Sequence, residues 1–120
     1  MKKLALMVIT FISLMNVYAN EYDDSVKVLL KKAKIEQDAR RPQMALEYLQ
    51  MAVAVDPNFI EAQKSLGLQA VELRQYDLAK QAFLKVLASQ PNDAVALENV
   101  LQISFNFRKW EEAIQFGKRL

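Results

Sequence analysis

The stretch VAVDPNFIEAQKSLGL, from Val53 to Leu68, ends one helix and begins another within a few residues. Pro57 cannot continue the preceding helix, because proline lacks a backbone N–H and its ring restricts the residue before it. Asp56 can serve as a turn or cap residue beside this proline. Apolar and small residues then recur at three- and four-residue steps, which is the spacing of an amphipathic helix. The stretch therefore predicts a helix, a tight corner and a second helix.

A second corner of the same kind lies in LASQPNDAVALENVL, which begins at Leu87. Its proline, Pro91, follows Pro57 by 34 residues, and Asn92 stands where a turn or cap residue is expected. Other positions keep the same period, and several of them hold small or aromatic residues. These sets are Ala45, Ala79 and Ala113; Pro42, Tyr76 and Trp110; Ala52, Val86 and Leu120; Ala33, Gly67 and Leu101; and Leu49, Phe83 and Gly117. So many matches predict three copies of one structural unit.

Each copy is predicted to form two amphipathic helices, because the apolar spacing is interrupted once within it. The expected helices span residues 23–39, 42–55, 59–73, 76–89, 93–106 and 109–120. Gly67 and Ala79 are small residues placed where the two helices of the middle copy should cross closely. Aromatic side chains such as Phe83 should fill the space toward neighbouring helices. A single hairpin cannot bury its apolar face alone, so the copies should stack on one another.

This pattern resembles the tetratricopeptide repeat (TPR) family. The middle copy carries the resemblance through Leu66, Gly67, Tyr76, Ala79, Phe83 and Pro91. It departs from the family pattern where Gln63 and Ala70 replace an early tryptophan and a mid-helix tyrosine. The resemblance implies an all-α fold, a right-handed solenoid of about three antiparallel helical hairpins. The alternative is a generic helical bundle or a related helical-hairpin repeat.

The repeat domain is expected to cover residues 26–120, with repeats at about 26–59, 60–93 and 94–120. The third repeat stops at Leu120, short of a full period. We therefore expect either that the array continues in a longer protein or that the last hairpin needs a partner. The second case predicts self-association through the C-terminal end.

The first 19 residues are typical of a secretory signal peptide. Two lysines precede an apolar run from Leu4 to Leu14, and small residues near Ala19 suit cleavage after that residue. An uncleaved membrane anchor is the alternative, but a span needs about 20 mostly apolar residues. Residues 20–25 would then form a short lead-in to the repeats. This reading predicts a periplasmic or otherwise extracytoplasmic protein.

The charge balance argues against a nucleic-acid partner. The chain has 16 basic and 14 acidic side chains, and two of the lysines lie in the predicted signal peptide. The remaining chain then has 14 of each sign, whereas nucleic-acid-binding domains usually show a basic face. A local cluster of cations, formed by Lys27, Lys31, Lys32, Lys34, Arg40 and Arg41, is interpreted as a solvated end face. The alternative for this cluster is an acidic partner or an anionic membrane surface.

The residue inventory predicts that the chain is not an enzyme. It contains no cysteine and no histidine, which removes the usual metal ligands and several catalytic groups. The serines lie in no recognisable catalytic motif, and there is no glycine-rich phosphate loop. We therefore expect no catalytic residue, no metal site and no cofactor.

The resemblance to TPR proteins implies where a partner would bind. In that family the first helices of the hairpins line a concave groove that holds peptides or protein segments. Matching the repeat places fifteen residues of this chain in such a groove, apolar ones mixed with charges of both signs. They are Lys27, Leu30, Lys34, Gln37 and Asp38; Glu61, Lys64, Leu68, Val71 and Glu72; and Val95, Glu98, Gln102, Phe105 and Asn106. This mixture suits a protein segment with some hydrophobic anchors.

These expectations combine into one functional hypothesis. The protein would be an exported scaffold or adaptor that binds protein segments and assists the assembly of an envelope or secretion complex, which can be associated with a membrane. The alternative is a TPR regulatory or recruiting module of a longer enzyme or sensor protein.

Overall fold

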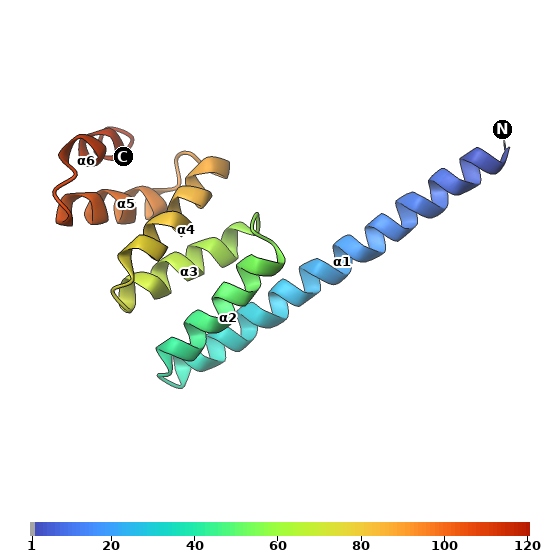
Figure 1. Cartoon of the computed structure of the whole chain (residues 1–120), viewed down its shortest axis with the longest axis horizontal. Coiled ribbons are helices and arrows are strands. Elements are labelled where there is room, and N and C mark those ends of the chain that lie inside the picture. Colours follow the sequence, from blue (N-terminus) through green and yellow to red (C-terminus); the bar gives the residue numbers. More distant parts are fainter. Residues whose placement is uncertain (1) are drawn as a thin grey trace.

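A computed structural model describes residues 2–120, and the side chains of residues 18–23 lie outside that description. These described residues form helices joined by short irregular connections, and none of them lies in a strand. Its helices are α1 (Lys2–Asp38), α2 (Pro42–Val55), α3 (Ile60–Glu72), α4 (Tyr76–Ser89), α5 (Ala94–Asn106) and α6 (Trp110–Gly117). Figure 1 shows the later helices folded together at one end of α1, while the other end of α1 extends away from them. The predicted all-α fold is confirmed.

Two predicted helix limits are corrected. The first helix begins at Lys2 rather than at residue 23, since no glycine or proline interrupts the chain before Pro42. The last helix, α6, is shorter than predicted and ends at Gly117. The other four helices agree with the prediction to within one residue at each end.

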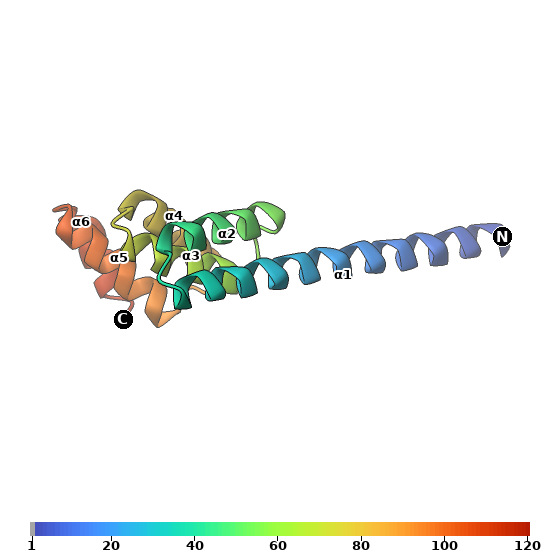
Figure 2. The ribbon, with the colours of Figure 1, turned by 90° about the horizontal axis from the view of Figure 1, so that it is seen from below.

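The helices pair in sequence and then stack. Contacts join α1 with α2, α3 with α4 and α5 with α6, and further contacts join α2 with α3 and α4 with α5. In Figure 2 the even-numbered helices α2 and α4 lie on one side of the stack, and α1 and α3 lie on the other. Successive hairpins therefore form a short solenoid, in which each hairpin covers the apolar face of the one before it.

Each hairpin turns through an arginine in the left-handed backbone conformation. The φ angles are 55° at Arg40, 59° at Arg74 and 58° at Arg108, and these residues are spaced by the repeat period. In the first turn the N–H of Arg40 donates to the carbonyl of Gln37 at 3.0 Å, and the N–H of Arg41 donates to that of Glu36 at 2.9 Å. The same two backbone bonds close the other two turns. This pattern is a Schellman motif, which satisfies carbonyl groups left free at a helix end.

The corners between hairpins use aspartates. In the first corner the N–H of Asn58 donates to Asp56 Oδ1 at 2.9 Å, beside the proline that ends α2. In the second corner Asp93 is the N-cap of α5, and its Oδ1 accepts from the N–H of Ala96 at 2.9 Å. Asn92 lies in the turn itself, which is one of the two roles expected of it, and the cap of α5 is Asp93, the residue immediately before Ala94.

The predicted close crossing in the middle hairpin is confirmed. Gly67 and Ala79 are buried, and a Cβ atom at Gly67 would lie only 2.7–2.9 Å from three ring atoms of Phe83. In the third hairpin the sizes are exchanged, since Leu101 occupies the position equivalent to Gly67 and Gly117 the position equivalent to Phe83. A Cβ at Gly117 would lie 3.6 Å from Leu101 Cδ1, which is ordinary contact. Each crossing thus pairs one large and one small residue, whichever helix supplies them.

Candidate partner-binding surface

The predicted groove positions fall on α1, α3 and α5, the first helices of the three hairpins. Direct side-chain bonds join these helices to one another: Gln37 of α1 reaches Gln69 of α3, and Lys64 of α3 reaches Asp93 at the start of α5. The helices therefore form one continuous surface. Equivalent positions of the repeat lie at equivalent places on it.

Three apolar side chains are exposed on this surface. Leu68 is 49% exposed, Val95 37% and Phe105 56%, and they come from α3 and α5. The ring of Phe105 meets that of Trp110 edge to face, with centroids 5.1 Å apart, so the apolar area continues toward α6. Most of the polar positions are exposed as well; these are Lys27, Lys34, Asp38, Glu61, Glu72, Glu98, Gln102 and Asn106. The surface thus offers apolar anchors among groups that can form hydrogen bonds and ion pairs.

Two predicted positions mainly support the fold. Leu30 and Val71 are half-buried and pack against the central core. They hold α1 and α3 in place and present little area to a partner.

Gln69 is a buried residue that the repeat pattern did not single out. It is 2% exposed and lies in α3, where its Oε1 accepts from Gln37 Nε2 at 2.8 Å and its Nε2 donates to Glu72 Oε2 at 3.1 Å. The equivalent positions in the other repeats are Ile35 and Ile103, so a polar residue in an otherwise apolar set was the available signal. A buried amide that lost these partners would be costly, so the chain of bonds fixes α1 against α3.

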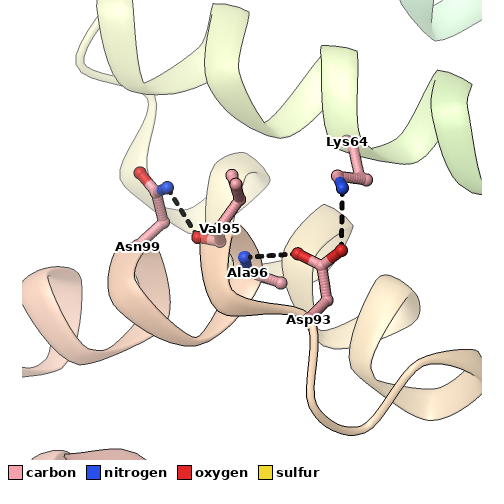
Figure 3. A network of polar contacts seen from close by, with 5 residues as sticks. All are labelled: Lys64, Asp93, Val95, Ala96 and Asn99. Carbon is pink, nitrogen blue, oxygen red and sulfur yellow. Dashed lines mark hydrogen bonds and ion pairs between the residues drawn. The ribbon is translucent and has the colours of Figure 1, made fainter. Parts of the chain in front are cut away.

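Lys64 belongs to a polar network that joins α3 to the start of α5 (Figure 3). Its Nζ lies 2.7 Å from Asp93 Oδ2, while the other carboxylate oxygen of Asp93 caps the helix. The hydrogen bond from Lys64 is the main cause that lowers the pKa of Asp93, followed by the backbone bond from Ala96. Lys64 is therefore held in an ion pair, although the sequence pattern predicts it as a residue that faces a partner. Asp93 itself was not predicted as part of this site.

Other polar groups on the surface are held only loosely. Lys34 and Asp38 form an exposed ion pair at 2.9 Å within α1, and Gln102 Nε2 donates to Asn106 Oδ1 at 2.9 Å within α5. Such exposed pairs, four residues apart on one helix, contribute only about 0.3–0.5 kcal/mol. These groups can therefore exchange their partners within the helix for groups on a bound segment at little cost.

Among residues 2–120, no group of three or more His, Cys, Asp or Glu side chains is arranged to hold a metal ion. The expectation that the chain is not an enzyme stays a prediction.

Known proteins of similar structure include one that is described as a TPR protein. No protein-family model matches the sequence, and no curated protein matches it. A crystal structure of MamA matches with a TM-score of 0.71 and 21% identity, over 79% of this chain and 52% of that one. A crystal structure of YrrB, described as a TPR protein with an unusual peptide-binding site, matches with a TM-score of 0.70 and 23% identity over 79% and 49%. A structure described as MamA MSR-1 C2 matches with a TM-score of 0.71 and 26% identity over 78% and 54%.

These likenesses confirm the predicted fold, a TPR-like solenoid of helical hairpins. The chain spans about half the length of the solved structures named here.

Proposed function

We propose that this chain is a protein-interaction scaffold that holds a segment of a partner protein against α1, α3 and α5. The observation that carries the proposal is the set of exposed apolar side chains, Leu68, Val95 and Phe105, on the same surface as exposed charges of both signs. Apolar side chains would anchor the segment, and the charged groups would set its orientation and register.

The comparisons support this proposal at the level of the fold. One neighbour of similar structure is described as having a peptide-binding site. A surface built by several stacked hairpins suits an extended segment, since each hairpin presents equivalent positions along its length. Gln69 and the Lys64–Asp93 pair hold the three helices in one arrangement, so the binding surface is ordered before the partner arrives.

We further propose that the scaffold is exported, with cleavage after Ala19, and serves an envelope or secretion complex. Ten large apolar side chains between Leu4 and Val17 are each more than half exposed, which suits a segment recognised by export machinery or by lipid. Within residues 2–120, no helix is both long and apolar enough to cross a membrane. The side chain of Ala19 lies outside the described residues.

Self-association through the C-terminal end is a second part of the proposal. Trp110 and Ile114 on α6 are 50% and 56% exposed. Their equivalents in the preceding hairpin, Tyr76 and Lys80, lie against the third hairpin: the ring of Tyr76 meets that of Phe107 edge to face, and Lys80 forms an ion pair with Glu112. The last hairpin thus presents the face that the solenoid elsewhere covers, so a membrane-associated complex or a second copy of the chain would find an apolar surface there.

A matched pair of substitutions tests the binding surface. Leu68→Asp places a charge among the apolar anchors, and Leu84→Asp makes the same change at an exposed leucine on α4, away from the surface. We expect affinity capture from the envelope fraction to lose its partner with Leu68→Asp and to keep it with Leu84→Asp. Equal recovery with both variants, at equal helical content by circular dichroism, would exclude this surface as the binding site.

A further inference from the structure

The three arginines that turn the hairpins, Arg40, Arg74 and Arg108, occupy a backbone conformation that suits glycine. A left-handed φ brings the Cβ of an ordinary residue close to its own backbone, whereas glycine adopts it without that cost. The chain nevertheless carries arginine at all three turns, at intervals of one repeat. A strained conformation that recurs with the same side chain suggests that the side chain has a role of its own.

These arginines have no ion-pair partner within the part of the chain that the structure describes. All three side chains are exposed, and none of them forms an ion pair there. Arg41, the residue next to the first turn, differs because it pairs with Glu36. Each turn arginine also lines a shallow surface hollow, of about 350 Å³ at Arg40, 360 Å³ at Arg74 and 420 Å³ at Arg108.

Most acidic side chains beside these turns already have another role. Glu72 accepts a hydrogen bond from Gln69, and Glu112 pairs with Lys80. Asp77 and Glu111 lie in the first turns of α4 and α6, where a negative charge favours the helix dipole. The arginines can also favour the dipole at a helix C-terminus, but a cation within the last helical turn would do so without a strained backbone.

We propose that Arg40, Arg74 and Arg108 form a second interaction surface, which binds an acidic protein segment with one carboxylate group at each hairpin turn. A guanidinium group presents paired N–H donors that match the two oxygens of a carboxylate. The line of turns, one per hairpin, matches an extended chain rather than a single small anion. This surface adjoins the face of α1, α3 and α5 at Arg40, whose hollow is also lined by Gln37 and Glu72, and it extends the proposed function to the hairpin turns.

The position of the turns favours a protein segment over a lipid surface. The first turn lies at the C-terminal end of α1, whereas the ten exposed apolar side chains between Leu4 and Val17 lie in its N-terminal part (Figure 1). At about 1.5 Å per helical residue, Arg40 lies roughly 40 Å from Leu14 along the helix axis. In the uncleaved chain, a membrane that receives the apolar end of α1 would therefore not reach the turn arginines, and after the proposed cleavage this apolar segment is no longer present to hold the chain at a membrane.

Binding of a fluorescent oligoglutamate peptide to the full chain in non-ionic detergent tests this proposal, with oligoglutamine as the reference peptide. Low ionic strength is needed because exposed charge pairs are screened by salt. We expect Arg40→Gln, Arg74→Gln and Arg108→Gln together to weaken binding by about tenfold, the combined effect of three exposed charge pairs. The corresponding triple lysine variant should keep most of the affinity, because it keeps the charges.

Two further variants separate this role from a structural one. The triple glycine variant should lose binding and melt at a higher temperature than the parent, because it removes both the charges and the backbone strain. Lys85→Gln and Lys118→Gln together remove two exposed charges elsewhere and should leave binding intact. Unchanged binding in the triple glutamine variant would overturn the proposal. An equal loss of oligoglutamate binding in the Lys→Gln control would also overturn it, as would a lower melting temperature of the triple glycine variant. Arginine-dependent binding to anionic vesicles or RNA, without binding to oligoglutamate, would overturn it as well.

Discussion

Gly67→Ala adds one methyl group at the close crossing of α3 and α4 and should destabilise the fold. The new Cβ would lie 2.7, 2.8 and 2.9 Å from three ring atoms of Phe83, all of them too short for ordinary carbon contacts. Phe83 is fully buried, so its ring cannot move aside into solvent. The helices α3 and α4 would have to separate to admit the methyl group.

Two opposing effects set the magnitude. Alanine is favoured over glycine inside a helix by about 0.5–1 kcal/mol. Overpacking of a well-packed core costs about 1–3 kcal/mol, and the separation of α3 from α4 places this change toward the upper part of that range. We therefore expect a net loss of about 1–2 kcal/mol in the free energy of unfolding. For a domain of this size, each 1 kcal/mol lowers the melting temperature by about 4–8 °C.

Thermal unfolding of the full chain, followed by circular dichroism, measures the effect. Gly117→Ala is the matched control, since its Cβ would meet only Leu101 at 3.6 Å, and its melting temperature should equal or slightly exceed that of the parent. Phe83→Leu removes the obstructing ring at a cost of its own, and in that background Gly67→Ala should become neutral or stabilising. The reasoning is refuted if Gly67→Ala melts at or above the parent temperature, or if its effect is the same with and without the ring.

Three further predictions concern the network, the C-terminal end and export. Because the pKa of Asp93 is lowered in the fold, its contribution to stability is present at neutral pH and is lost as the pH falls below the ordinary aspartate value and through the lowered pKa. Asp93→Asn keeps a side-chain cap but removes the charge facing Lys64. Its free energy of unfolding, measured in urea at pH 7, should therefore be about 1 kcal/mol lower than that of the parent. This difference should shrink on acidification, and a difference that stays constant with pH would contradict the prediction. Ile114→Glu should reduce self-association in sedimentation velocity across a range of concentrations, and a concentration-independent monomer in the parent would remove the basis for this expectation. Mass spectrometry of the exported protein should find Asn20 at its N-terminus, and retention of the first residues would disprove cleavage.

The sequence was sufficient to predict the helices of the repeat region because their signals are local. Proline at the corners and the three- and four-residue spacing of apolar residues act within a few residues of their own position. The exchange of large and small residues between Gly67–Phe83 and Leu101–Gly117 was also visible, since both pairs stand at repeated positions. The start of α1 was misplaced because the predicted cleavage site was taken as a structural boundary, although nothing there interrupts a helix.

The candidate sites were harder to predict because they depend on contacts distant in sequence. The ion pair of Lys64 with Asp93 spans 29 residues, and the bond of Gln37 with Gln69 spans 32, so neither appears as a local motif. The repeat of arginine at the hairpin turns was present in the sequence. Its meaning was hidden, because arginine has no preference for a left-handed backbone and only the fold places it there.

Site-specific photocrosslinking tests the central claim most directly, namely that α1, α3 and α5 hold a protein segment. A photoreactive residue is placed at Leu68, Gln102 or Phe105 on that surface, and at Gln81 or Leu84 on the exposed side of α4. We predict that the three surface positions crosslink to the same partner in the envelope fraction and that the two positions on α4 do not. Equal crosslinking from both groups, or partners that differ among the three surface positions, would contradict the proposed binding surface.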